Sequence, residues 1–286
     1  MRLLILLAVA CGSLAAQQLR PIPWKPFPHK YKGQAAPAAV RSGGVIQTFF
    51  FPEDVVFPHL ATGAGWETVY TIVNMTPTSV TMDLYFVNQQ GGELEVTIRE
   101  QGSSGTLSGA SFEVTLPGGG STTIALVDTT PGLTRQGWAF LDYDATSARL
   151  GGFATFRQRI AGRADFEALV PLSSYEDATF MLSVDETAGF ITALAICNPD
   201  DIADAVVTLT MLDPDGVTIA TRTINLAAGA HMAFAIREQF PAMVERAGTL
   251  LVESNTDRLS GIGLRFNTAG GDSFSSIPVM NWQGFF

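Results

Sequence analysis

A ten-residue segment that occurs twice constrains the fold of this chain more than any other feature. It reads Gly-Trp-Glu-Thr-Val-Tyr-Thr-Ile-Val-Asn over Gly65–Asn74 and Gly-Phe-Ile-Thr-Ala-Leu-Ala-Ile-Cys-Asn over Gly189–Asn198. Gly, Thr, Ile and Asn coincide at a constant offset of 124 residues, and Trp66 corresponds to Phe190. Both the even and the odd positions are largely apolar, which is typical of strands near the centre of a sandwich. The repeat predicts two tandem copies of one β module, and it places Trp66 and Phe190 in the two cores.

The turns after these strands also recur. Hairpin turns with a well-placed glycine are expected at Asn88–Gly92 and Asp213–Gly216. Farther on, Leu-Pro-Gly-Gly-Gly-Ser from Leu116 matches Leu-Ala-Ala-Gly-Ala-His from Leu226, now at an offset of 110. An insertion in the first copy explains the smaller offset, and the Gly/Ser-rich segment Gln101–Ser111 predicts a flexible loop there.

This order of strands and turns resembles bacterial extracellular immunoglobulin-like or fibronectin-like modules over about residues 53–280. The resemblance implies antiparallel sandwiches that serve as adhesive, spacer or carbohydrate-contacting units, although neither copy has the cysteine pair of antibody-type domains. We therefore predict an all-β chain of two tandem antiparallel Ig-like β-sandwich domains, at residues 45–173 and 174–286. A single transmembrane barrel is the structural alternative, but its strands would alternate strictly in polarity.

The N-terminal residues are typical of a secretory signal peptide over residues 1–16. Arg2 precedes the apolar run Leu3–Ala10, and small residues follow at Ser13–Ala16. Lipidation at Cys11 is a minor alternative to ordinary cleavage. The protein is thus expected to be secreted, periplasmic or on the outer cell surface, with no transmembrane segment in the mature chain. Cleavage would leave one cysteine, Cys197, which we interpret as a small buried hydrophobic residue rather than a reactive thiol.

Residues 17–44 are predicted to be a disordered linker because they contain five prolines and then Ala-rich and Gly-rich stretches. Trp24 and Phe27 within it are candidates for docking on a domain or a partner. All three lysines precede residue 45, whereas all 27 acidic residues follow it with only 11 arginines. The body therefore carries a net charge near −16, which argues against binding nucleic acid.

Catalytic and metal-binding patterns are weak. His29, His59 and His231 are isolated and show no zinc-ligand spacing, and the body has no lysine for Schiff-base chemistry. A Ser-His-Asp site has no Gly-x-Ser-x-Gly elbow to support it, although sequence distance does not exclude one.

Carboxylates, arginines and one tryptophan remain as candidates. A glycosidase would need paired acids, for which the candidates are Asp142 and Asp144, with Glu253 at the position that matches Asp142. Calcium prefers hard oxygen ligands, which the acidic turns would supply through Asp200, Asp201, Asp204, Asp213 and Asp215. The basic cluster of Arg157, Arg159 and Arg163 would contact an anionic glycan or, more simply, the surrounding acids. Trp138 shares a strand face with Asp142 and is the aromatic residue most suited to stacking on a sugar.

We expect a non-catalytic structural or adhesive interaction protein of the bacterial envelope or extracellular space. An unknown protein or glycan is its partner, and it needs no cofactor. No residue is assigned to catalysis or metal binding, and the ligand-binding residues are unknown at this stage. A pair of carbohydrate-binding modules is the first alternative, and a secreted hydrolase is the second.

Overall fold

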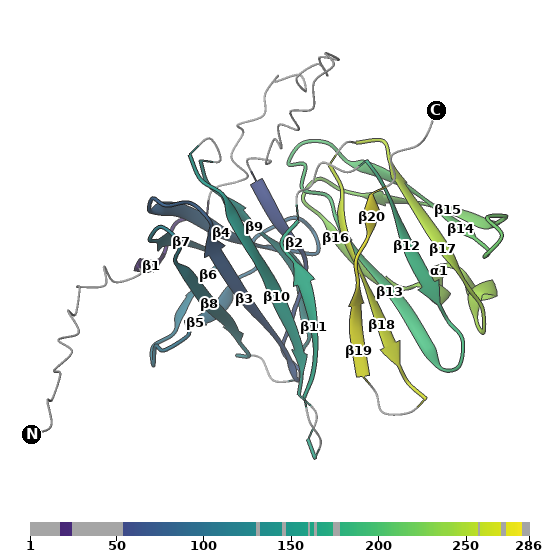
Figure 1. The fold of residues 1–286 in the computed structure, drawn as a ribbon, viewed down its shortest axis with the longest axis horizontal. Helices are drawn as coiled ribbons and strands as arrows, with labels where there is room; N and C mark the ends of the chain where they lie inside the picture. Colours follow the sequence, from purple (N-terminus) through teal and green to yellow (C-terminus); the bar gives the residue numbers. More distant parts are fainter. Residues whose placement is uncertain are drawn as a thin grey trace, which may run out of the picture.

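The computed structural model describes residues 18–24, 54–129, 132–144, 147–159, 161–162, 165–173, 178–256, 258–269 and 273–281. Within them the chain is all-β, with several antiparallel sheets, as the sequence predicts. Figure 1 shows two bodies of strands side by side. Strands β1–β11 form the first body, which we call repeat 1, and β12–β20 form the second, which we call repeat 2. The signal-peptide assignment lies outside the described residues.

Repeat 1 consists of two facing sheets. Sheet A has the strand order β1-β7-β4-β9-β2, and sheet B has the order β11-β10-β3-β8-β5-β6. The strands are β1 (Gln18–Pro21), β2 (Asp54–Thr62), β3 (Trp66–Asn74), β4 (Val80–Asn88), β5 (Val96–Glu100), β6 (Leu107–Gly109), β7 (Ser111–Leu116), β8 (Ser121–Val127), β9 (Arg135–Asp142), β10 (Leu150–Gln158) and β11 (Phe166–Pro171).

Repeat 2 has the same plan. Sheet C has the order β15-β14-β17-β12-β20, and sheet D has the order β16-β13-β18-β19. The elements are β12 (Thr179–Asp185), β13 (Phe190–Cys197), β14 (Ala205–Leu212), β15 (Thr218–Leu226), β16 (His231–Ala235), α1 (Ile236–Gln239), the 3-10 turn η1 (Pro241–Met243), β17 (Ala247–Ser254), β18 (Ser260–Asn267), β19 (Ser273–Ile277) and β20 (Met280–Asn281). No helix in the described residues is long and apolar enough to cross a membrane.

The strand orders and turns show that the repeats are equivalent. The order β7-β4-β9-β2 corresponds to β15-β14-β17-β12, and β11-β10-β3-β8 corresponds to β19-β18-β13-β16. Ala64 and Ala188 both adopt φ 51°, an unusual value for a residue other than glycine. Gly119 and Gly229 both adopt φ 68°, at the offset of 110 that the sequence indicates.

The sheet order differs from that of an immunoglobulin domain. In the constant-type domain the first two strands belong to one sheet, whereas here β2 lies in sheet A and β3 in sheet B. The same crossing separates β12 from β13 in repeat 2. The resemblance therefore extends to the antiparallel layered architecture and stops short of the immunoglobulin topology. Turn residues mark where strands end, but they carry no information on which sheet the next strand joins.

Each repeat has its own core. Alternate residues of the strands point between the two sheets, as in β3, where Thr68, Tyr70, Ile72 and Asn74 are buried and the residues between them are half-buried. The core of repeat 2 follows the same alternation, for example at Leu194 and Ile196. Period-2 burial of this kind stabilises a sheet that is covered on one face.

Two segments predicted to be irregular contain strands. In the insertion, Leu107–Gly109 forms β6 and pairs with β5, which lengthens sheet B, so the expectation of a wholly flexible loop is wrong there. In the linker range 17–44, Gln18–Pro21 forms β1 and pairs with β7 at the edge of sheet A. Trp24 then packs edge-on against Tyr85. Residues 25–44, with Phe27 and His29, lie outside the described residues.

Candidate functional site

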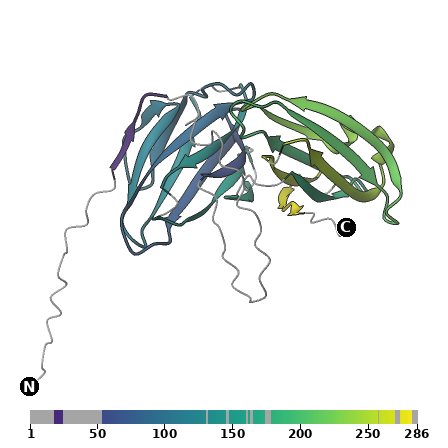
Figure 2. The same ribbon diagram turned by 90° about the horizontal axis from the view of Figure 1, so that it is seen from above.

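The contact between the two repeats is the most extensive feature outside the separate cores. Sheet D of repeat 2 turns its outward face to β2 and β11, where the sandwich of repeat 1 is open at the side, and Figures 1 and 2 show β11 beside β19. Ala195, Ile262, Leu264 and Phe274 of this face belong to the same buried cluster as the core of repeat 1. Sheet D is therefore buried on both faces, and burial of this apolar surface holds the repeats together.

Polar contacts fix the register of this junction. The indole Nε1 of Trp138 donates a hydrogen bond to the carbonyl oxygen of Gly229 at 2.8 Å. The backbone nitrogen of His231 donates to the carbonyl oxygen of Gln89 at 3.1 Å. Gly91 has φ 84°, and a Cβ there would lie 2.6 Å from the carbonyl oxygen of Ala228. The first hairpin turn must therefore keep a glycine for repeat 2 to approach this closely.

Trp138 is the clearest correction to the sequence analysis. The prediction that it stacks on a sugar at the surface is wrong, because its side chain is fully buried. It does point out of sheet A on the face that it shares with Phe140, but repeat 2 covers that face with Cys197 and the Gly229 turn. The strand-face assignment was correct, and the covering layer was invisible because it comes from residues 59 or more positions away in the chain.

His59 and His231 meet at the same junction, one from each repeat. The Nδ1 of His59 lies 3.0 Å from the Nε2 of His231, and the two rings are parallel within 9°. Both side chains are buried, at 5% and 3% exposure. Burial lowers the pKa of His59 to about 4, and burial together with His59 lowers the pKa of His231 well below its usual range. The two histidines are 172 residues apart and isolated in the sequence, so their spacing does not predict this pair.

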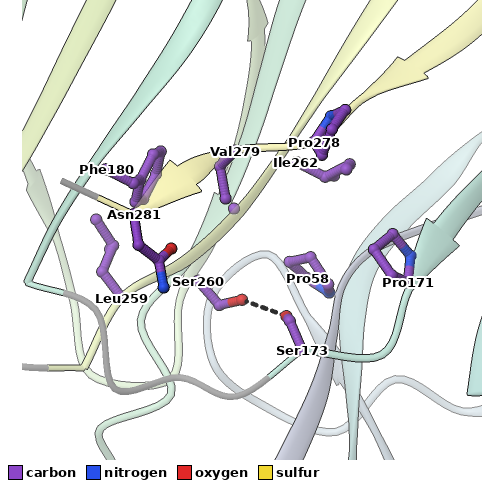
Figure 3. A pocket seen from close by; sticks show the side chains of 11 residues that line it. Pro58, Pro171, Ser173, Phe180, Leu259, Ser260, Ile262, Pro278, Val279 and Asn281 are labelled. Atoms are coloured by element: carbon purple, nitrogen blue, oxygen red, sulfur yellow. Dashed lines mark hydrogen bonds between the residues drawn. The ribbon is translucent and has the colours of Figure 1, made fainter. Parts of the chain in front are cut away.

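A pocket of about 270 Å³ opens at one side of the junction. Figure 3 shows its lining, in which proline and apolar side chains surround a hydrogen bond between the Ser173 and Ser260 hydroxyls at 3.0 Å. None of the described residues that line this pocket carries a carboxylate, imidazole, amine or thiol. The described lining therefore offers no general base to either serine.

The outward face of sheet B in repeat 1 is the equivalent of the buried face of sheet D. It presents Val69, Thr71, Phe153 and Leu169, of which Phe153 is 37% exposed and Leu169 is 51% exposed. Register pairing aligns Thr71 with Phe153 on neighbouring strands. We call these four residues and their neighbours the outer face of sheet B. This sheet face keeps two large apolar side chains in contact with solvent.

The predicted arginine cluster borders this face. Arg157 bonds the Glu167 and Glu67 carboxylates, at 2.7 and 3.2 Å, and Arg159 bonds Glu67 at 2.8 Å. The acidic neighbours raise the pKa of Arg157, above all through the hydrogen bond that its guanidinium donates to Glu167. The simpler of the two predicted roles, pairing with surrounding acids, is confirmed for these two arginines. Arg163 lies outside the described residues.

The acidic turns use their carboxylates to hold their own backbones. Asp200 Oδ1 accepts hydrogen bonds from the backbone nitrogens of Ile202 and Ala203, and Asp213 Oδ1 accepts from Asp215 and Val217. Asp204 Oδ1 accepts from the nitrogen of Ala228. The bonds of Asp200 and Asp213 are the local side-chain turns typical of aspartate, whereas Asp204 ties its turn to the one at Ala228. Within the described part of the chain, no group of three or more potential ligands is placed to hold a metal ion.

The candidate catalytic acids come from both repeats. Asp142 ends β9 half-buried, in register with Asp83 on β4, and Asp144 is exposed two residues farther on. Glu253 is exposed on β17, in the other repeat. Register pairing therefore places Asp142 beside Asp83, which the sequence does not indicate, and places Glu253 on a different sheet.

The predicted burial of Cys197 is confirmed, whereas Trp66 and Phe190 are less buried than predicted. Cys197 is fully buried, which confirms the interpretation as a small hydrophobic residue, and burial raises the pKa of its thiol. Trp66 and Phe190 were placed in the two cores, but both are only partly buried. Trp66 packs on Phe274 of repeat 2, with ring centroids 5.4 Å apart, and Phe190 lies 3.4 Å beneath the guanidinium of Arg265.

A comparison with models of protein families gives no match for this chain, and a comparison with curated proteins gives none either. Function must therefore be inferred from the geometry above. One sequence signal does distinguish the two equivalent faces. The outward positions of β13 and β16 carry Ala193, Ala195 and Ala233, where repeat 1 has Val69, Thr71 and Thr123. Small apolar residues permit the close approach that buries sheet D.

Proposed function

We propose that this chain is an exported, non-catalytic structural or adhesive interaction protein of the bacterial envelope or extracellular space. The observation that carries the proposal is the use of one sheet face for docking. In repeat 2 the outward face of sheet D binds another module, and in repeat 1 the equivalent face is open to solvent. A chain built from such modules holds a binding face on a rigid body, which is how sandwich proteins display interaction surfaces.

The outer face of sheet B has the composition of a protein-binding surface. Phe153 and Leu169 supply exposed apolar area in the middle of β10 and β11. The ion pairs of Arg157 and Arg159 with Glu67 form a charged margin at one end. An apolar centre with a polar rim is the usual anatomy of an interface between proteins. We expect a folded partner, which can cover a whole sheet face, rather than a small ligand, which needs a concave site.

The carbohydrate alternative loses its main support. It requires a row of exposed aromatic side chains, and Trp138 is buried. Among the described residues, Phe153 is the aromatic side chain that ranks as exposed, at 37%. One partly exposed ring gives no platform for successive sugar units, so we rank a protein partner ahead of a glycan.

The test is binding to immobilised chain from residue 17 onward, with envelope and extracellular-matrix proteins and a glycan array as analytes, with and without calcium. We expect saturable binding of a protein that is lost in the double variant Phe153→Ser/Leu169→Ser. The matched control is Ile202→Ser/Val217→Ser, which removes two apolar side chains that are 67% and 61% exposed in repeat 2.

Each other outcome changes the proposal in a defined way. Protein binding that both double variants keep would show that the outer face of sheet B is not the site. Saturable binding to a glycan would move the assignment to the carbohydrate alternative. Turnover of a glycoside or peptide substrate would overturn the non-catalytic assignment.

A further inference from the structure

The His59–His231 contact is a buried, uncharged pair that joins the two repeats. A hydrogen bond at 3.0 Å between Nδ1 and Nε2 needs one proton between the two nitrogens. Both rings can then be neutral, with one donating and one accepting. If both rings are protonated, two N–H groups face each other and the bond is lost. The Nδ1 of His231 is buried without a hydrogen-bond partner, so no other group is in place to accept a second N–H there.

Among the described residues, the surroundings of the pair offer no group that stabilises a positive charge. The ring of Phe156 meets His59 edge-on at 5.0 Å, and Cys197 is the strand partner of His231. In the part of the chain that the structure describes, burial is the cause of the lowered pKa of His59, and burial followed by the charge of His59 is the cause for His231. Protonation in the closed junction is therefore opposed first by desolvation and then by repulsion.

Two kinds of titratable group lie on the strands packed around the histidine pair. They are buried groups that stay neutral and charged groups that are half-buried or exposed. Tyr70 on β3 and Cys197 on β13 are buried, and burial raises the pKa of both. The charged residues on the packed elements are half-buried or exposed, and they are Glu67, Arg135, Asp142, Arg157, Glu167, Arg237, Glu238 and Arg265. None of them acts on the pKa of either imidazole.

We propose that this histidine pair makes the junction acid-labile, so that in acid the two repeats separate while each keeps its own sandwich. Once the junction opens, the imidazoles reach water and bind protons at their ordinary pKa near 6.5. The direction of the pH dependence follows from the difference between the imidazole pKa values in the open and the closed junction. The closed junction is fully stable above about pH 6.5, and it weakens as the pH falls from there toward the pKa of about 4 in the closed state. For His59 alone, this raises the opening equilibrium about 100-fold between pH 7 and pH 4.

Cys197 supplies a built-in reporter of the opening. It is fully buried at the junction, in the cluster that includes Trp138 and Val56 of repeat 1. The chain from residue 17 contains every described residue and no other cysteine. Its thiol would be modified with 4,4′-dithiodipyridine, a disulfide that reacts with thiols in acid, and rates would be normalised to a small free thiol at each pH. Far-ultraviolet circular dichroism under the same conditions would monitor the sandwiches.

We expect the normalised rate to rise at least 100-fold from pH 7 to pH 4 while the strand signal is retained. The variant His59→Gln/His231→Gln keeps a polar contact that does not titrate, and its rate should be nearly independent of pH. Asp213→Asn replaces a half-buried acid that lies outside the junction, and this control variant should keep the wild-type response. If the double variant does not fold at pH 7, His59→Gln alone should reduce the response by about half on a logarithmic scale.

Three results would overturn the proposal. They are a wild-type rate that does not change with pH, an equal acid response in the glutamine variant, and loss of the strand signal at the pH where Cys197 becomes reactive. The last result would mean that acid unfolds the whole protein and that the junction has no independent transition.

Discussion

The side-chain amide of Asn74 and that of Asn198 hold the same turn in the two repeats. Each asparagine is fully buried at the end of its central strand, and each Nδ2 lies within hydrogen-bonding distance of three backbone carbonyl oxygens. Each Oδ1 accepts a backbone N–H two residues ahead. The carbonyl acceptors are Thr78, Leu116 and Pro117 in repeat 1, and Ala203, Leu226 and Ala227 in repeat 2. The asparagine thus ties the polar turn to the later glycine turn.

Asn74→Ala and Asn198→Ala should each destabilise the protein by about 3 kcal/mol, because carbonyl groups near the core would lose their donor. Urea denaturation measures the change. Asn225 is exposed on β15, and Asn225→Ala should change the free energy of unfolding by less than about 0.5 kcal/mol. A cost in one repeat and none in the other would contradict the equivalence of the two networks.

Gly137 on β9 and Gly248 on β17 occupy equivalent positions in sheets A and C of the two repeats. A Cβ at Gly137 would lie 2.0 Å from the carbonyl oxygen of Val87, and one at Gly248 would lie 2.2 Å from that of Leu212. Because both obstacles are backbone atoms, alanine at either position should cost more than about 3 kcal/mol or prevent folding. The comparison is Gly119→Ala, where φ is 68° with open space around it, and about 1–2 kcal/mol is expected. Equal losses of stability at all three positions would argue against a close approach of the neighbouring backbone to Gly137 and Gly248.

Trp138→Ala should destabilise the protein by about 3–5 kcal/mol, because it empties a buried site between the repeats and frees the Gly229 carbonyl. Trp138→Phe retains most of the packing and should cost less. Leu133→Ala at an exposed position is the control. Thermal unfolding of the three variants separates these cases. A stable Trp138→Ala variant that loses binding to a glycan would restore the surface role that the structure contradicts.

Calcium should leave the melting temperature unchanged within about 1 °C, because Asp200, Asp204 and Asp213 each use Oδ1 to hold a turn. Scanning calorimetry with excess EDTA and then with millimolar calcium measures this. An increase of several degrees in calcium would show a site that these turns complete with other ligands. Asp200→Ala should cost about 1 kcal/mol with or without calcium, because it removes two local hydrogen bonds.

The sequence by itself determined the repeated architecture. Coincident Gly, Thr, Ile and Asn at an offset of 124 located the equivalent strands, and the same turn angles now occur at Ala64 and Ala188. This was possible because turns and strand periodicity depend on neighbouring residues, whose preferences are local. Burial of Cys197 and the pairing of Arg157 with acids were predictable from the general behaviour of a thiol and a guanidinium, although distant residues supply the partners.

The tertiary structure decided what covers each face. Trp138 and Phe153 both stand on outward faces of their sheets, yet repeat 2 buries the first and solvent reaches the second. Likewise, His59 and His231 are 172 residues apart and share no motif, and they meet because sheet D docks on β2. Alternation along a strand specifies two faces, but the free energy of covering a face depends on a surface supplied by distant residues. That choice is made only when the two repeats pack together.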